Sequence, residues 1–387
     1  MKFGFIGNMN NNHFSTVRFL RDRGVDAELL LTNDEQSHFH PSCDTIDTDY
    51  MKYTRRLAWG SWKSFLKTDS YQIKNDLKGF DVLVGCGLAP AYCSKAGIFL
   101  DIFTPYGSDL YWETRIRYAS PKHFLNVLMA TIYQRKGIRE SKVFHMAPSS
   151  DYFESMYQKY ASNVIRWYEG MPMVYIPPDR PIGELYLNKT QWQDQFMEIR
   201  RESDLVVFSH GRHYWGDRAD PDSKGVDSLL EGWKLFIDSR PNLNATLIFL
   251  EYGRDVDKSR NYIDKLGLSD SVRWLPQMFR KDILYGMSTV DIVVGEFVHS
   301  WVARGVIFEG LAMEKPIITC RSEAHSSEKD IFQVYSACTP DAIASSLNEF
   351  LDDIPKGRVM GKSGNEWYLN EVVKKSVDNY MKYAQSK

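Results

Sequence analysis

Residues 2–23 of this chain read KFGFIGNMNNNHFSTVRFLRDR, and this stretch sets the expectation for the fold. The apolar run over residues 2–7 predicts a buried strand. The polar turn NMNNNH follows, and residues 14–23 then place apolar side chains at helical spacing. A strand, a turn and a helix in this order are typical of a parallel sheet covered by helices.

The same alternation continues through both halves of the chain. Further strands are expected at residues 27–31, 81–84, 97–103, 143–146, 205–209, 245–250, 272–275, 290–294 and 316–319. Further helices are expected at residues 226–237, 259–266, 305–313 and 361–384. The pattern is interrupted between the halves by Pro172, Pro177, Pro178 and Pro181, which break regular elements.

We therefore predict an α/β chain with two Rossmann-like domains. The first covers residues 1–175, a linker covers 176–203, and the second covers 204–360. Residues 361–387 are predicted to form a helix that packs back on the first domain. Two such domains place the carboxyl ends of both sheets around one cleft, where ligands of open α/β sheets bind.

The composition excludes several classes of protein. Hydrophobic residues make up 43% and charged residues 25%, which indicates a globular chain. The net charge of -2 argues against a nucleic-acid-binding protein. The five cysteines form no CxxC pair, so we expect neither a disulfide framework nor a zinc site, and a reducing cytosol fits best. No stretch of about 18 apolar residues occurs, so we expect no membrane span.

Two stretches of the second half carry polar residues suited to binding a nucleotide. Residues 208–231 place Arg212 after a strand and Lys224-Gly225 before a helix, where two cations could neutralise a diphosphate. Residues 291–319 place Glu309 on a helix after a strand, where a carboxylate could accept from ribose hydroxyls. The alternatives are a solvated loop for the first stretch and a helix-capping carboxylate for the second.

These two stretches resemble the retaining glycosyltransferases of family four. The Gly211-Arg212 and Lys224-Gly225 pairs match the G-R and K-G elements of that family, and residues 309–316 match the second Glu of its E-x7-E signature and the tail that follows. The resemblance implies the GT-B fold, with two Rossmann-like domains facing each other across a cleft. It also implies a hexosyltransferase that uses a nucleotide-sugar donor without a metal, with Arg212 and Lys224 on the diphosphate and Glu309 on the ribose.

The resemblance departs at the first Glu of the signature. That position, eight residues before Glu309, is Trp301, and the nearest acid, Glu296, lies five residues too early. The role of the first Glu is therefore open. We also place Gly211, Gly305 and Gln277 in the donor site.

The first half is expected to bind the acceptor. Its candidates follow predicted strands: Asn11, Asn12 and His13 in the first turn, then Tyr106, Gly107 and Asp109. Asp109, in a Gly-Ser-Asp element similar to one in such transferases, could bind a sugar hydroxyl or cap the next helix. We group it with Arg212 and Lys224 as catalytic candidates. His13, His210 and His213 follow no standard metal-ligand spacing, so no metal or other cofactor is expected.

The resulting hypothesis is transfer of a sugar, with retention, to a glycan or lipid-linked acceptor in surface polysaccharide or glycoconjugate biosynthesis. A nucleotide-sugar 2-epimerase and a non-catalytic homologue that acts as a binding subunit are the alternatives. A cytoplasmic location is expected, with binding to the inner face of an anionic membrane. Residues 51–67 and 115–142 suggest that binding because both mix basic with aromatic and aliphatic side chains. Ordinary amphipathic helices with solvated Lys and Arg explain both segments equally well.

Overall fold

The computed structural model describes residues 1–117, 120–146, 151–178, 190–220, 222–299, 302, 305–322 and 331–387. The chain divides into two compact units. We name Met1–Tyr175 with Asn370–Lys387 the N-terminal unit, and Ile176–Leu369 the C-terminal unit.

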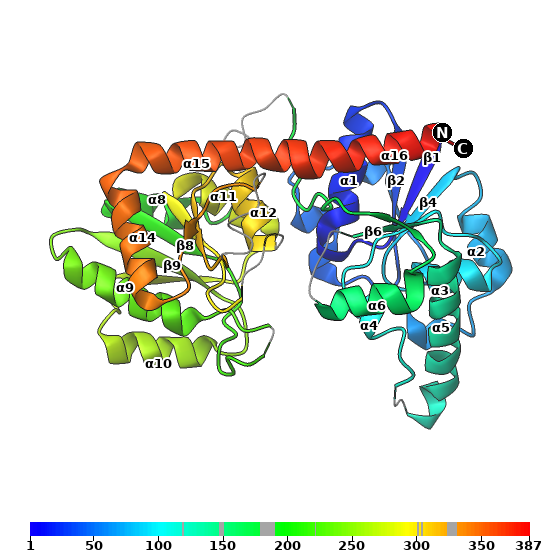
Figure 1. The fold of residues 1–387 in the computed structure, drawn as a ribbon, viewed down its shortest axis with the longest axis horizontal. Coiled ribbons are helices and arrows are strands. Elements are labelled where there is room, and N and C mark those ends of the chain that lie inside the picture. The colour runs from blue at the N-terminus through cyan, green and yellow to red at the C-terminus, as the bar shows by residue number, and fades with distance from the viewer. Residues whose placement is uncertain are drawn as a thin grey trace. The chain divides into compact units, whose positions relative to one another are not determined.

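The N-terminal unit is built on a parallel sheet with strand order β3-β2-β1-β4-β5-β6-β7 (Figure 1). Its strands are β1 (Lys2–Ile6), β2 (Asp26–Leu31), β3 (Thr54–Arg56), β4 (Val82–Gly85), β5 (Ile102–Phe103), β6 (Val143–His145) and β7 (Ile165–Trp167). Its helices are α1 (Asn12–Asp22), α2 (Ser70–Asp76), α3 (Ala89–Lys95), α4 (Ser108–Tyr111), α5 (Pro121–Glu140), α6 (Asp151–Ala161) and α16 (Lys375–Gln385), and short 3-10 turns include η5 (Trp62–Ser64). Strand β1 is central and apolar because it is covered on both faces.

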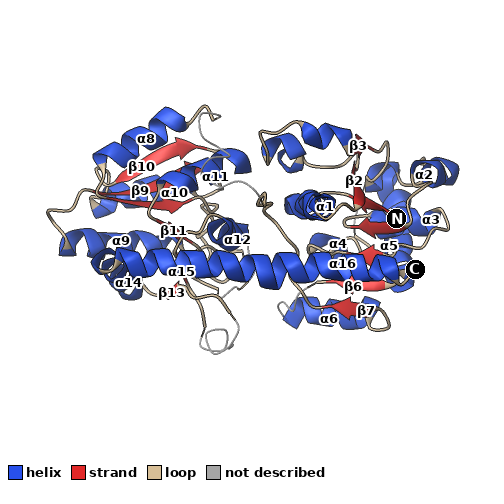
Figure 2. Ribbon diagram, turned by 90° about the horizontal axis from the view of Figure 1, so that it is seen from above, coloured by secondary structure: helices blue, strands red, loops and turns tan. Residues whose placement is uncertain are grey.

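The C-terminal unit repeats this architecture, with strand order β10-β9-β8-β11-β12-β13. Its strands are β8 (Leu205–Ser209), β9 (Ala245–Glu251), β10 (Val272–Pro276), β11 (Ile292–Val294), β12 (Ile317–Thr319) and β13 (Tyr335–Ser336). Its helices are α8 (Gln193–Glu202), α9 (Val226–Ser239), α10 (Val256–Leu266), α11 (Arg280–Thr289), α12 (Gly305–Ala312), α14 (Pro340–Asp352) and α15 (Ile354–Trp367). Figure 2 shows the strands of each unit lying between helices.

One predicted strand is much shorter in the structure. The apolar run at residues 97–103 contributes only Ile102–Phe103 to the sheet. Gly97, with φ +68°, instead ends helix α3, and the Ile98 N–H closes the turn on the carbonyl of Cys93. Gly adopts this left-handed conformation without steric cost, so the turn takes the residues that the apolar pattern assigned to a strand.

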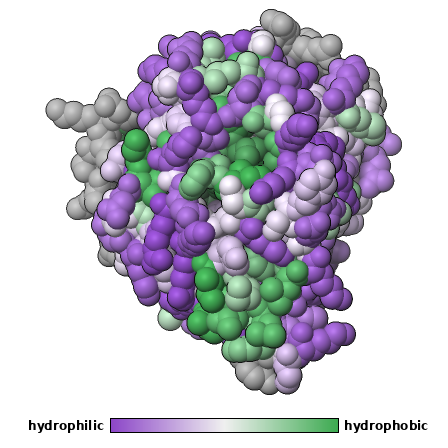
Figure 3. All heavy atoms as spheres, turned by 90° about the vertical axis from the view of Figure 1, so that its right-hand side faces the viewer, coloured by the Kyte–Doolittle hydropathy of each residue, from purple (hydrophilic) through white to green (hydrophobic). Residues whose placement is uncertain are grey.

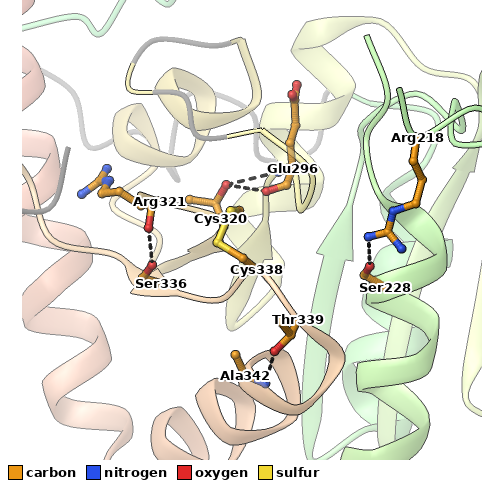
Figure 4. The surroundings of a disulfide bond; sticks show 10 residues. Arg218, Ser228, Glu296, Cys320, Arg321, Ser336, Cys338, Thr339 and Ala342 are labelled. Carbon is orange, nitrogen blue, oxygen red and sulfur yellow. Dashed lines mark hydrogen bonds between the residues drawn. A yellow bond between two sulfur atoms is a disulfide. The ribbon is translucent and has the colours of Figure 1, made fainter. Parts of the chain in front are cut away.

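The expectation of no disulfide is wrong for one pair of cysteines. Cys320 and Cys338 are disulfide-bonded, with a Cα–Cα distance of 4.4 Å (Figure 4). Cys320 directly follows β12, and β12 pairs in parallel with β13, where Thr319 is the partner of Ser336. Pairing of two short strands thus brings together cysteines that are 18 residues apart, a spacing that gave no signal in the sequence.

The end of the chain returns to the N-terminal unit. Helix α15 is followed by a π-helical turn, η6 (Tyr368–Lys374), and then by α16. The Tyr380 side chain is fully buried, and its hydroxyl lies 3.0 Å from His145 Nδ1. The Tyr383 hydroxyl donates to Asp101 Oδ1 over 2.9 Å. Helix α16 is therefore part of the core of the N-terminal unit.

No helix among the described ranges is both long enough and apolar enough to cross a membrane.

Candidate functional site

The carboxyl edge of the C-terminal sheet gathers buried charged side chains. His210 directly follows β8, Glu296 follows β11, and Lys224 precedes α9. Glu309 lies on α12, in the segment between β11 and β12. Parallel strands present their carboxyl ends at one edge, which is the usual ligand-binding edge of such sheets. Charged side chains are rarely buried unless they are paired, so the partners of these residues determine which groups of a ligand this edge can bind.

Lys224 and Glu296 form a buried ion pair. Lys224 Nζ lies 2.6 Å from Glu296 Oε1, and the two side chains are 9% and 7% exposed. The backbone fixes both residues, because Lys224 N–H donates to the Tyr214 carbonyl and the Lys224 carbonyl accepts from Phe297 N–H. Glu296 Oε2 is buried without a hydrogen-bond partner among the described residues. An unsatisfied buried carboxylate oxygen is costly, so this position is suited to a ligand that donates a hydrogen bond.

Glu309 is held between two further basic groups. Its Oε2 accepts from His210 Nε2 over 2.7 Å, and its Oε1 accepts from Arg280 Nε over 2.7 Å. Burial alone would raise the pKa of Glu309, but the charges and hydrogen bonds of Arg280 and His210 outweigh it and lower the pKa to about 2. The carboxylate is thus ionised and oriented, and each oxygen keeps a second lone pair for a hydroxyl donor.

The other predicted donor residues lie at the surface of this edge. The Arg212 side chain is 46% exposed and reaches Asp222 only at 4.0 Å. A Cβ on Gly211 would lie 4.0 Å from Val306, in the first turn of α12, so Gly211 is next to Gly305 at the start of that helix. Gln277 is exposed between β10 and α11. The structure therefore buries one predicted cation, Lys224, and leaves the other, Arg212, exposed.

The first turn of the N-terminal unit is organised by a residue that the sequence did not single out. The Asn8 side chain donates to Asn11 Oδ1 over 2.8 Å and accepts from Phe14 N–H over 2.9 Å. Asn10 and Asn11 both have positive φ, which Asn tolerates better than most residues. Asn12 Oδ1 is buried without a partner among the described residues.

The three histidines weighed as metal ligands, of which His13 was also a cleft candidate, have different partners. His13 Nδ1 is 2.8 Å from the Gly7 carbonyl and its Nε2 is 2.7 Å from Thr104 Oγ1. Burial lowers the pKa of His13 to about 4, so the ring is neutral and ties the first turn to the end of β5. In the C-terminal unit, His210 contacts Glu309, whereas His213 Nδ1 lies 2.8 Å from Ser259 Oγ.

Both carboxylate oxygens of Asp109 accept hydrogen bonds from backbone N–H groups. Its Oδ1 accepts from the N–H groups of Tyr106 and Gly107, and its Oδ2 accepts from Gly87 N–H, all over 3.0–3.1 Å. The side chain is fully buried, and burial raises its pKa to about 7. Asp109 thus joins the loop after β4 to the loop that holds Tyr106 and Gly107.

This arrangement predicts a structural penalty when Asp109 is changed. Asp109→Ala removes the acceptor of three backbone donors, one buried and two part-buried, and is expected to lower the free energy of unfolding by about 2–4 kcal/mol. Urea unfolding of the purified variant measures this, with Asp34→Ala, an exposed carboxylate of the same unit, as the control. Wild-type stability combined with lost turnover would show a direct role in substrate binding instead.

A second carboxylate, Glu35, lies at the same edge of the N-terminal sheet. Its Oε2 accepts from Asn8 N–H over 2.9 Å, and burial raises its pKa to about 7. A Cβ on Gly7 would lie 2.7 Å from Cys86 Sγ and 3.8 Å from Glu35 Oε2, so these groups crowd one point beside the first turn. The sequence gave no signal for Glu35 because it lies in a polar loop outside any motif that we singled out.

Comparison with known protein families and with curated proteins finds no match to this chain. Solved structures do match it over its full length. HepE of Anabaena in complex with UDP aligns with a TM-score of 0.61 at 16% identity, and both chains are covered completely. Sucrose-phosphate synthase from Thermosynechococcus elongatus aligns with a TM-score of 0.59 at 13% identity, covering 100% of this chain and 98% of that one. The fold is GT-B.

A third match with the same fold has a different activity in its name. UDP-GlcNAc 2-epimerase from Methanocaldococcus jannaschii aligns with a TM-score of 0.54 at 12% identity, covering 95% of this chain and 98% of that one. The predicted fold class, two Rossmann-like domains of the GT-B type, is confirmed. Fold alone does not select one activity among those that GT-B proteins carry out.

In this GT-B chain the position of the first signature Glu, Trp301, lies outside the described residues. The structure does place Glu296, the acid that stood too early for the motif, at the end of β11 and against Lys224. The sequence missed this pairing because the two residues are 72 positions apart.

Proposed function

We propose that the protein transfers a sugar from a nucleotide-sugar donor to a glycan or lipid-linked acceptor, as a hexosyltransferase of surface polysaccharide or glycoconjugate biosynthesis. The proposal rests on the buried ion pair of Lys224 and Glu296 at the carboxyl edge of the C-terminal sheet. The same edge holds Glu309 with its partners His210 and Arg280. The presence of UDP and of UDP-glucose in two HepE structures supports a uridine nucleotide as the first donor to test.

The chemistry expected of this edge is stabilisation of a leaving diphosphate. Lys224 is a buried cation, and a cation held in a water-poor site stabilises developing negative charge strongly. The ionised Glu309 carboxylate can accept from the two ribose hydroxyls. Retention of the anomeric configuration is part of the proposal, on the strength of the resemblance to family four, and NMR of the product tests it.

Binding of UDP tests the donor site directly. At a concentration of about 100 times its Kd, a ligand that binds only the folded protein adds about 2.7 kcal/mol of stability, so we expect a rise in Tm of several degrees. Turnover is then measured with UDP-sugars and a panel of glycan and lipid-linked acceptors. Absence of any nucleotide-induced shift across UDP, GDP and ADP would remove the proposal.

The role of Arg212 is testable by one substitution. Arg212→Ala is expected to lower kcat/KM for transfer about 10- to 100-fold, because a charge-assisted contact to the diphosphate is worth about 1.5–3 kcal/mol. Arg218→Ala is the matched control, since Arg218 is an exposed arginine in the same loop that pairs with Asp227 over 3.1 Å. Equal activity of Arg212→Ala and wild type would place Arg212 outside the mechanism.

A nucleotide-sugar 2-epimerase is the second candidate. It is favoured by Glu35 in the N-terminal unit, a titratable group that could supply acid or base chemistry, and by the similarity to a 2-epimerase. Incubation with the donor alone separates the two, because an epimerase changes the sugar without an acceptor. Donor binding with turnover in neither assay would identify a non-catalytic binding subunit. Cytoplasmic location and binding to the inner face of the membrane stay predictions.

A further inference from the structure

Helix α5 exposes three large apolar side chains on its outer side, in addition to apolar residues such as Val127 and Ile138 that it buries. Phe124, Leu125 and Ile132 are exposed, and Leu125 exposes 61% of its surface. The buried side of the same helix includes Asn126 and Gln134. An ordinary surface helix carries polar side chains on its outer side, so the outer side of α5 is unusually apolar.

The buried polar residues fix the rotation of α5. The Gln134 side chain donates to the carbonyls of Gly87 and Asp109 and accepts from Ala91 N–H. Asn126 Oδ1 accepts from Leu66 N–H over 3.0 Å. Each of these contacts satisfies a buried polar group, which would be costly to leave unpaired.

Close packing fixes the same rotation independently. Gly137 lies so close to helix α3 that an added Cβ would be 2.0 Å from the Pro90 carbonyl oxygen. The helix therefore cannot turn to bury Phe124 and Leu125 without breaking these contacts. Their exposure is a fixed property of the fold.

The exposed apolar residues form one surface with their neighbours. We define the α5 surface by the exposed side chains of Trp112, Ile116, Phe124, Leu125 and Ile132, with Leu66 beside Asn126. Figure 3 shows apolar side chains gathered at the lower part of this face of the molecule, where α5 descends in Figure 1. Large exposed apolar patches mark interaction sites.

The charge around this surface is strongly positive. Residues 112–142 contain seven Lys and Arg but only two Glu, in a chain whose net charge is -2. The cations Arg115, Lys122, Lys136 and Arg139 are exposed. Apolar side chains among exposed cations match the interface of an anionic bilayer, where the chains enter the headgroup region and the cations contact lipid phosphates.

The second basic segment, residues 51–67, forms no such face of its own. Its large side chains Leu57, Trp59 and Phe65 are buried in the core of the N-terminal unit. It contributes Leu66, in the turn that follows η5, and Trp62 of η5 packs edge-on against His123 at a centroid distance of 5.8 Å. The structure thus separates two segments that were equivalent in the sequence.

We propose that the α5 surface docks the protein on an anionic lipid bilayer. A second copy of the chain is disfavoured as the occupant, because a symmetric contact would bring like charges together. The inference is independent of the proposed sugar transfer, since docking requires no nucleotide and is measured without one.

Flotation of the full chain with vesicles tests this proposal. Vesicles of pure phosphatidylcholine are compared with vesicles containing about 30% phosphatidylglycerol, at low and at physiological salt. Wild-type protein is expected to float with the anionic vesicles only, and less so at higher salt. Phe124→Ser with Leu125→Ser, and separately Lys122→Glu with Lys136→Glu, should each reduce the bound fraction at least about tenfold.

The control is Lys74→Glu with Lys78→Glu, two exposed lysines of the same unit that lie outside residues 112–142. It should float as wild type does, and circular dichroism and Tm confirm that every variant is folded. Wild-type protein that stays with the unbound fraction at low salt would overturn the proposal. So would a dimer that Phe124→Ser with Leu125→Ser dissociates while flotation is unchanged.

Discussion

Lys224→Met is expected to lower kcat/KM for sugar transfer by about 10²–10³-fold, the effect of removing one group that stabilises a developing oxyanion. The Lys224 side chain is buried against Glu296, so the substitution removes a cation inside the site and not one at the surface. The substitution also leaves the Glu296 carboxylate buried without its cation, which costs about 3–5 kcal/mol of stability. Steady-state kinetics with a UDP-sugar and urea unfolding measure the two effects separately.

The double variant Lys224→Met with Glu296→Gln distinguishes catalysis from folding. Removal of both charges eliminates the uncompensated carboxylate, so most of the lost stability should return. Activity should not return, because the cation for the diphosphate is still missing. Recovery of wild-type kinetics in the double variant would show that Lys224 serves only to neutralise Glu296.

Glu309→Gln is expected to weaken UDP binding about 10- to 100-fold while the fold is kept. A neutral amide accepts more weakly from hydroxyls than a carboxylate does, and it no longer neutralises Arg280, whose Nε lies 2.7 Å from Glu309. Calorimetric titration with UDP measures the loss. Unchanged UDP affinity would reduce Glu309 to a helix-stabilising role.

The same variant should show a distinct pH dependence of stability. The pKa of Glu309 is lowered from 4.5 to about 2, so its contribution is fully present above pH 4.5 and is lost as the pH falls toward 2. Glu309→Gln lacks this group. The difference in unfolding free energy between wild type and variant should therefore shrink between pH 5 and pH 3.

The long strands could be predicted from the sequence because each is an uninterrupted apolar run. Residues 205–209, all buried, are an example. The edge strands β3 and β13 could not, because β3 is Thr-Arg-Arg and β13 has only two residues. Such segments become strands only through pairing with a neighbour, which no local pattern records.

At the candidate site, the sequence could single out Lys224 and Glu309 but not the residues with which they pair. Lys224 and Glu309 stood out because each accompanies a strand end and a helix start. Their partners were hidden: His210 is 99 residues from Glu309, and Arg280 begins a helix that the pattern did not predict. Strand order decides which loops share an edge, so only the folded sheet shows which charges meet.

The return of α16 to the N-terminal unit has a consequence for how the chain matures. Tyr380 belongs to an aromatic cluster with Phe5, His145 and Trp167, at ring-centroid distances of 5.4–5.6 Å. Translation makes Phe5 long before Tyr380, so this core of the nascent chain stays incomplete until Tyr380 has been made. The N-terminal unit therefore begins to emerge first but is completed only after the C-terminal unit, because residues 176–369 are contiguous and can fold before residues 370–387 are made.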